Sequence, residues 1–188
     1  MQHMMTQEKI DLRARQDAEA AQIRAARADP KAFGLLYDQY APSIYRYLLS
    51  RLGNVEEAQD VTSQTFLTAF EAFLRYQHQG YFSAWLFSIA RSKYVDHLRR
   101  ARRQPDMLDE QVKADLPDPL GQVIETERVG ELKKCIRGLP EREQELLRLR
   151  YVAGLSFAEV ASLLNKKEDA VKKSIYRLLD RLQSQLEA

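Results

Sequence analysis

Apolar residues recur at helical spacing along most of the chain, and no segment alternates between apolar and polar residues as a β-strand does. The first clear helix is predicted over 29–53, where Asp29 can cap the N-terminus, Pro30 fits the first turn and Gly53 fits the end. The preceding residues, 1–28, are polar and rich in alanine, and we interpret them as a helical extension. The pattern predicts an all-α protein.

Two further helices are predicted in the N-terminal half. Asn54, with Glu57 three residues later, suits the start of a helix over 54–73. Its expected buried residues are Phe66, Ala69, Phe70 and Phe73. After a loop over 75–82, Ser83 can cap a third helix that runs into a cluster of arginines. The apolar stripe expected on that helix is Trp85, Leu86, Ile89, Val95 and Leu98.

Residues 104–121 separate this half from the next. They hold three prolines and five acidic residues and carry no helical stripe, which is typical of a flexible linker. Helical periodicity resumes over 122–188. We therefore predict two small helical domains, 29–103 and 122–188, joined by a flexible acidic linker and preceded by the extension 1–28.

The net charge of +2 conceals a strongly uneven distribution. Six basic residues and one acid lie in 91–103, six basic residues and three acids lie in 166–181, and seven acids with one lysine lie in 106–127. Two basic patches of this kind suit a polyanionic partner. The chain has no apolar run long enough for a membrane span and its N-terminus lacks the apolar core of a signal peptide, so we expect a cytoplasmic protein without membrane insertion.

The last fifty residues have the spacing of a helix-turn-helix. Ser156 and Glu159 can form a capping box, Ala161 lets two helices cross closely, Asn165 tolerates a left-handed turn, and Val171 can pin the second helix to the first. Such a second helix can enter the major groove of DNA. The alternative is an amphipathic helical hairpin whose basic face is only solvated.

Both halves resemble one family. Residues 32–103, from "AFGLLYDQY" to "HLRRARR", resemble region 2 of bacterial extracytoplasmic-function sigma factors, and residues 122–186, with "GLSFAEVASLLNKKEDAVKKSIYRLL", resemble region 4. The resemblance implies a non-enzymatic promoter-recognition subunit of RNA polymerase. Region 2 would bind the clamp helices of the core β′ subunit and open the −10 element. Region 4 would read the −35 element and contact the β flap.

The resemblance also implies which residues contact each partner. The expected core-binding residues are Asp60, Val61, Ser63, Gln64 and Leu67. The expected −10 contacts are Tyr76, His78, Tyr81, Trp85, Arg91, Ser92, Arg99 and Arg100. The expected −35 contacts are Ser156, Lys167, Asp169, Lys172, Lys173, Ser174 and Arg177. Aromatic residues beside a basic helix suit a melted strand, although Trp85 belongs to an apolar stripe and fits a core position better than a stacking one.

The core-binding stretch "AQDVTSQTF" departs from the family pattern. Gln59 and Gln64 stand where the family usually has acids, so only Asp60 keeps its charge and docking on a basic clamp helix should be weak. A phosphate would restore negative charge there. The candidate phosphorylation sites are Thr62, Ser63 and Thr65. The alternatives are neutral drift and compensation by Glu56 and Glu57.

Two DNA-contacting positions also depart from the family. Ser92 replaces the usual asparagine and Ser174 the usual arginine, so the family's −10 and −35 sequence preferences cannot be transferred. Competing functions are a stand-alone helix-turn-helix regulator and a helical decoy that binds an anti-sigma protein. Further expected partners are an anti-sigma factor or a kinase. The histidines share no ligand spacing, and Cys135 lies among apolar positions, so no metal site or cofactor is expected.

Overall fold

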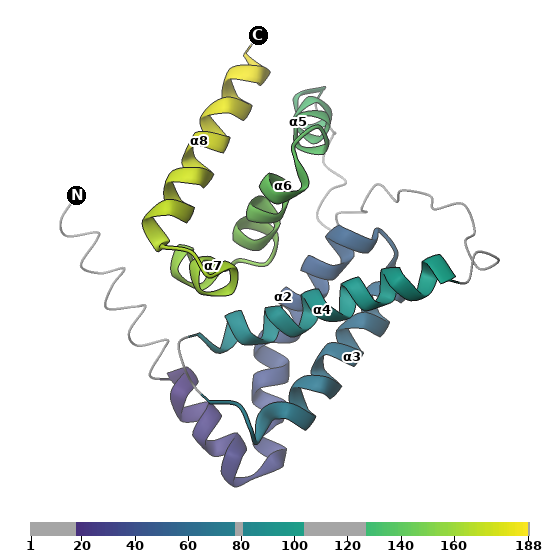
Figure 1. Ribbon diagram of the computed structural model, residues 1–188, viewed down its shortest axis with the longest axis vertical. Helices are drawn as coiled ribbons and strands as arrows, with labels where there is room; N and C mark the ends of the chain where they lie inside the picture. The colour runs from purple at the N-terminus through teal and green to yellow at the C-terminus, as the bar shows by residue number, and fades with distance from the viewer. Residues whose placement is uncertain (1–17, 78–80, 104–126, 188) are drawn as a thin grey trace.

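The computed structural model describes residues 18–77, 81–103 and 127–187. Within these ranges every regular element is a helix (Figure 1). None of the helices in this described part is long and apolar enough to cross a membrane. The predicted linker 104–121 and the candidate contact His78 fall outside the described residues.

Three long helices build the N-terminal domain, which we define as the described residues from 18 to 103. They are α2 (Phe33–Leu52), α3 (Val55–Phe73) and α4 (Phe82–Arg103). The predicted start signals are confirmed: Asp29 caps the short turn η1 (Pro30–Ala32), and the side chain of Asn54 accepts from the amide of Glu57 at 3.0 Å. Gly53 ends α2 in the left-handed conformation that a side chain would disfavour.

Residues 18–28 form a helix that packs on this domain. Ile23 and Ala26 lie in its core, and Arg27 donates a hydrogen bond to the carbonyl of Tyr76. The segment expected as a separate extension therefore contributes to the N-terminal domain over the residues that are described.

Three details of the predicted helices were wrong. Phe70 is 46% exposed, because it meets Phe33 edge-to-face at the border of the core. Val95 is also exposed, since the outer half of α4 extends beyond its neighbours. Ser83 does not cap α4 but lies inside its first turn, buried against the C-terminal domain.

The C-terminal domain, residues 127–187, contains four α-helices and a π-helical turn. They are α5 (Glu127–Arg137), α6 (Glu141–Leu147), η3 (Arg148–Val152), α7 (Phe157–Leu164) and α8 (Glu168–Leu186). The capping box of Ser156 and Glu159 is confirmed. Asn165 is left-handed, with φ 52°, and so ends α7 with the turn that the spacing predicted.

The two domains pack against each other. α7 lies on the N-terminal part of α4, and η3 lies against α2 (Figure 1). Buried residues of both domains, from Leu48 and Phe87 to Leu149 and Val160, belong to one continuous apolar cluster. We call the contact surface between the two domains the seam.

Candidate nucleic-acid interface

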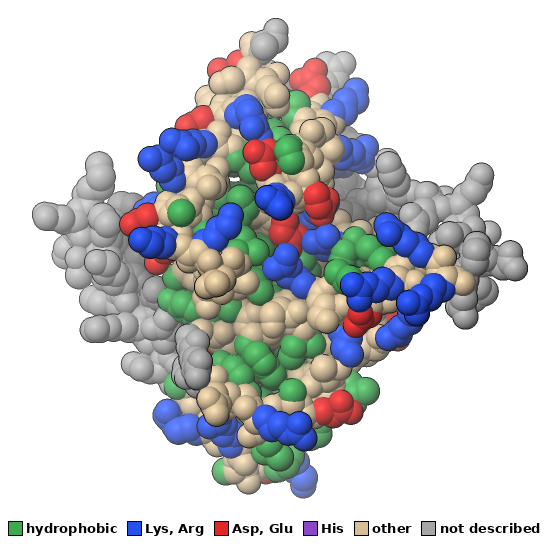
Figure 2. All heavy atoms as spheres, viewed as in Figure 1, with side chains coloured by type: hydrophobic (Ala, Val, Ile, Leu, Met, Phe, Trp, Pro, Cys, Tyr) green, Lys and Arg blue, Asp and Glu red, His purple; other side chains and the backbone are tan. Residues whose placement is uncertain are grey.

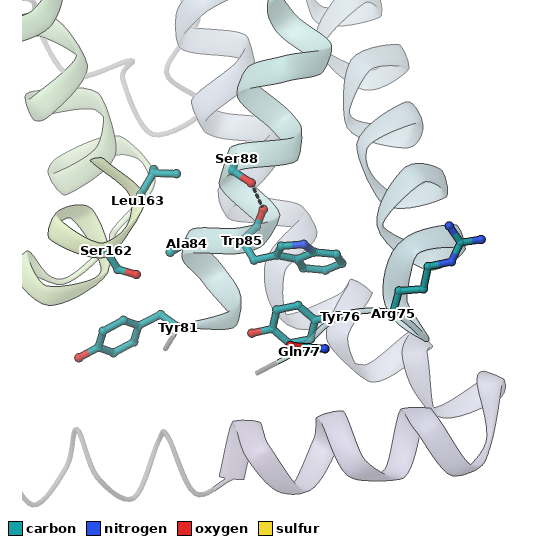
Figure 3. A pocket seen from close by; sticks show the side chains of 9 residues that line it. All are labelled: Arg75, Tyr76, Gln77, Tyr81, Ala84, Trp85, Ser88, Ser162 and Leu163. Atoms are coloured by element: carbon teal, nitrogen blue, oxygen red, sulfur yellow. Dashed lines mark hydrogen bonds between the residues drawn. The ribbon is translucent and has the colours of Figure 1, made fainter. Parts of the chain in front are cut away.

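A pocket of about 380 Å³ opens where α3 leads into α4. The rings of Tyr76 and Trp85 lie side by side in it, with centroids 4.5 Å apart, and Tyr81 stands at its other end (Figure 3). Ser162 and Leu163 of α7 line the same pocket from the C-terminal domain. Aromatic planes beside an open volume can receive an unstacked base.

Two of the lining rings, those of Tyr76 and Trp85, belong to a cluster of aromatic side chains. Phe82 is fully buried, and its ring centroid lies 5.2 Å from that of Trp85 and 5.5 Å from those of Tyr40 and Tyr76. Tyr76, expected in a flexible loop, is instead packed in this cluster. Trp85 is partly exposed, so it serves the core and lines the pocket at once.

Two tyrosines of this cluster stay protonated at neutral pH. Burial, reinforced by the charge of Glu19 and opposed by that of Arg27, raises the pKa of Tyr76 to about 12. Burial, together with a hydrogen bond to Glu19, raises the pKa of Tyr40 well above its usual range. The buried carboxylate of Glu19 therefore ties the helix 18–28 to the rings beneath the pocket.

The basic residues predicted on α4 divide into two groups. Arg99 and Arg100 are exposed near the end of the helix, where Lys and Arg side chains gather in Figure 2, and Ser92 is exposed as well. Arg91, by contrast, is engaged at the seam: its Nε lies 3.1 Å from Oε1 of Glu145.

The second basic surface lies on α8. Val171, Ile175 and Leu178 face the domain core. The predicted contacts Lys167, Asp169, Lys172, Lys173, Ser174 and Arg177 are all exposed. Blue side chains accordingly follow this helix in Figure 2. The arrangement is that of a helix-turn-helix whose second helix presents a ridge to a duplex.

The sequence analysis did not name one aromatic residue on that ridge, and one predicted contact also has a structural role. Tyr176 follows Lys172 by four residues, is 49% exposed and meets Phe157 at 5.9 Å between centroids; its helical spacing from the lysines was a usable signal. Ser156, expected to touch DNA, accepts a hydrogen bond from the amide of Glu159. Its side chain therefore caps α7, and its contact with DNA stays a prediction.

The expected core-binding face of α3 is only partly a surface. Asp60, Ser63 and Leu67 are exposed, and the side-chain amide of Gln64 donates to Asp60 at 2.6 Å. A groove of about 620 Å³ runs between this face and α2. Val61 is fully buried in the core, which leaves it no access to a partner.

Two of the three candidate phosphorylation sites lie on the buried side of α3. Thr62 and Thr65 donate hydrogen bonds to the carbonyls of Ala58 and Val61, at 2.6 and 2.7 Å. These bonds satisfy the hydroxyls and explain how threonine occupies a core position. A phosphate on the fully buried Thr65 would require α3 to leave the core, whereas Thr62 lines the groove between α2 and α3 and Ser63 is exposed.

No cluster of three or more His, Cys, Asp or Glu side chains that could hold a metal ion occurs among residues 18–77, 81–103 and 127–187.

Comparison with known proteins matches both halves of the chain. Residues 36–104 match the family model Sigma-70 region 2, and residues 130–182 match Sigma-70, region 4. The ECF RNA polymerase sigma factor SigW of Bacillus subtilis is 30% identical over 173 residues, which cover 85% of this chain and 91% of SigW. The chain belongs to the ECF family of RNA polymerase sigma factors. It is thus a transcription initiation factor of the sigma type.

Two other relatives belong to the same family. The ECF sigma factor BldN of Streptomyces coelicolor is 38% identical over 160 residues, covering 82% of this chain; the chain spans 60% of BldN's length. SigD of Mycobacterium tuberculosis is 32% identical over 179 residues, covering 90% of this chain and 84% of SigD.

Solved structures support the fold. The sigma factor RpoE of Bartonella quintana, solved with the anti-sigma factor NepR, superposes with a TM-score of 0.62 at 23% identity, covering 84% of this chain and 98% of RpoE. CnrH, solved with the cytosolic domain of CnrY, gives 0.58 at 22% identity, covering 89% of this chain and 96% of CnrH.

Proposed function

We propose that this sigma factor holds the melted strand of the −10 element at the aromatic pocket and along α4, and reads the −35 duplex with α8. The observation that carries the proposal is the pocket of Tyr76, Tyr81 and Trp85 at the start of a helix that ends in exposed arginines. Single strands are held by this combination of ring planes and cations.

The roles proposed for residues of α4 and α8 follow from where each residue lies on its helix. The exposed Arg99 and Arg100 track phosphates, and Ser92 lies between them and the pocket. On α8, Lys172 and Lys173 neutralise phosphates, while Ser174 and Arg177 can reach base edges. The hydroxyl of Ser174 also donates to the carbonyl of Ala170 at 2.8 Å, so in this conformation its oxygen can accept a hydrogen bond from a base but not donate one.

The core polymerase docks, in this proposal, on the exposed face of α3. Asp60, Ser63, Gln64 and the 60% exposed Leu67 offer one charge, two polar groups and an apolar contact to a clamp helix. The adjoining groove of α2 widens that surface. The chain acts in the cytoplasm and catalyses no reaction itself. RpoE was solved with an anti-sigma factor, and we extend that class of partner to this chain.

Gel filtration of the purified chain with bacterial core RNA polymerase, followed by transcription from a genomic promoter library, tests the proposal. We expect co-elution and discrete transcription start sites. Duplex binding without any binding to core would favour a stand-alone regulator instead. Binding of an anti-sigma protein without transcription would favour a decoy.

A further inference from the structure

One buried carboxylate joins the two domains. Glu145 of α6 is 6% exposed, and its Oε1 accepts a hydrogen bond from the hydroxyl of Tyr47 at 2.8 Å. The Nε of Arg91 lies 3.1 Å from the same oxygen, and Nη1 of Arg51 donates to the other one. The guanidinium of Arg51 lies over the ring of Tyr94, 4.2 Å from its centroid, which fixes its orientation.

The charges at this contact come from opposite sides of the seam. Arg51 and Arg91 belong to the N-terminal domain, whereas Glu145 and Glu141, whose Oε1 lies 3.0 Å from Nη2 of Arg51, belong to the C-terminal domain. On the N-terminal side the converging polar groups are two guanidiniums and one phenol, all of them donors. This donor set binds phosphate as readily as carboxylate.

The seam also reaches the single-strand surface. The hydroxyl of Ser83 donates to Glu159 of α7 at 2.7 Å, and α7 lines the aromatic pocket (Figure 3). Arg91 follows Trp85 by six residues, about 9 Å along the helix axis. Six residues also turn about 120° round the helix from Trp85, so a strand whose base enters the pocket would have to cross α4 for its backbone to meet Arg91.

We propose that Glu145 is an intramolecular substitute for a DNA phosphate. It occupies an anion site made of Tyr47, Arg51 and Arg91, and so holds the C-terminal domain over the single-strand surface. When the domains part, a backbone phosphate of the melted strand takes its place. The inference rests on the proposed function, because only a chain that binds single-stranded promoter DNA has use for the site.

The test compares the full-length chain with Glu145→Gln, which keeps the size of the side chain and removes its charge. Glu143→Gln is the matched control, since Glu143 makes the same kind of ion pair with Arg181 inside the C-terminal domain. Trp85 is the only tryptophan of the chain and reports on the seam through acrylamide quenching. Fluorescence anisotropy of a labelled, mixed-sequence single-stranded DNA oligonucleotide reports on binding.

We expect Glu145→Gln to raise the quenching of Trp85 and to bind the oligonucleotide roughly fivefold or more tightly than the parent chain, a gain of about 1 kcal/mol or more by the affinity relation. Glu143→Gln should match the parent in both readouts. If Glu145→Gln matches the parent as well, the inference is overturned.

A second pair of variants tests whether Arg51 and Arg91 only hold the two domains together or also bind a phosphate. Arg51→Gln and Arg91→Gln also break the contact with Glu145 and should raise the quenching of Trp85. They should nevertheless bind the oligonucleotide several-fold less tightly than Glu145→Gln, because each lacks a phosphate contact. The partly exposed Arg91 side chain makes its variant safe for folding if Arg51→Gln proves unstable. Affinities equal to that of Glu145→Gln would overturn the anion site.

The two experiments can distinguish an error in the role given to Glu145 from an error in the proposed function. If the parent chain co-elutes with core polymerase and starts transcription, but the variants show no increase in Trp85 quenching, only the role of Glu145 is refuted. A chain that binds neither core polymerase nor the oligonucleotide in any variant would refute both.

Discussion

The two surfaces assigned to DNA differ in their access to solvent. α8 packs on α5, α6 and α7 and leaves Lys172, Lys173 and Arg177 exposed. In the N-terminal domain, Arg91 is bound to Glu145 and the aromatic pocket is lined partly by α7. The surface for a duplex is therefore exposed, whereas the surface for a melted strand is partly covered, since Arg91 and one side of the pocket meet the C-terminal domain while Arg99 and Arg100 stay exposed. If Glu145 stands in for a phosphate as proposed above, contact of a single strand with Arg91 requires the seam to part, whereas contact of a duplex with α8 does not.

The largest effect on this difference is expected from removing the ring that supports Tyr76 and Trp85 from the core side. Phe82→Ala deletes a buried ring that contacts Tyr40, Tyr76 and Trp85, and it should lower the free energy of unfolding by about 3–5 kcal/mol. Tyr176→Ala, which truncates an exposed ring of α8, should cost under about 1 kcal/mol. Urea denaturation followed by circular dichroism measures both. Equal costs would mean that the covered surface does not depend on the core.

Substitutions on the exposed surface of α8 should lower the affinity for duplex DNA without changing the free energy of unfolding. Lys172→Ala with Lys173→Ala removes two phosphate contacts, which should lower the slope of log affinity against log salt by about 1.8 and the affinity for a promoter duplex roughly thirtyfold at physiological salt. Titrations of a promoter fragment at several salt concentrations measure the slope. Lys31→Ala with Lys134→Ala removes two exposed lysines elsewhere as a control. An unchanged slope would mean that α8 does not touch phosphates.

The geometry that exposes α8 depends on one backbone conformation. Asn165 has φ 52° and ψ 50°, so Asn165→Ala should destabilise the turn by about 1 kcal/mol, since alanine disfavours the left-handed region. Asn165→Gly should be tolerated because glycine adopts this region freely. Thermal unfolding of the two variants gives the difference. A glycine variant as unstable as the alanine variant would show that the side chain of Asn165, and not its backbone, matters.

The sequence predicted the helix ends and turns that depend on residues close together in the chain. The caps at Asn54 and Ser156 and the turn at Asn165 depend on residues at most four positions away. The seam was not predictable, because Tyr47 and Glu145 are 98 residues apart and nothing in either segment specifies the other. Burial on α3 was misjudged because hydroxyls bonded to the preceding turn let Thr62 and Thr65 replace apolar residues.

The smallest expected effect concerns the face of α3 that neither DNA surface uses. Ser63 is exposed and lies one helical turn after Gln59, which is one of the two positions where the family's acids are missing. A negative charge at Ser63 can therefore pair with a basic clamp helix. Ser63→Glu should raise the affinity for core polymerase by up to about 1 kcal/mol, or roughly fivefold. Thr65→Glu is not an equivalent mimic, because its carboxylate would lie in the core.

Ser63→Gln is the matched control for this variant, since it adds the same length of side chain without the charge. Competition for core polymerase against a labelled parent chain measures the three affinities. A gain by Ser63→Glu over Ser63→Gln that vanishes at high salt would support control of docking by a phosphate at Ser63. Equal affinities of the parent and Ser63→Glu would mean that the lost acids are compensated by other residues, of which Glu56 and Glu57, in the first turn of α3, are the nearest candidates.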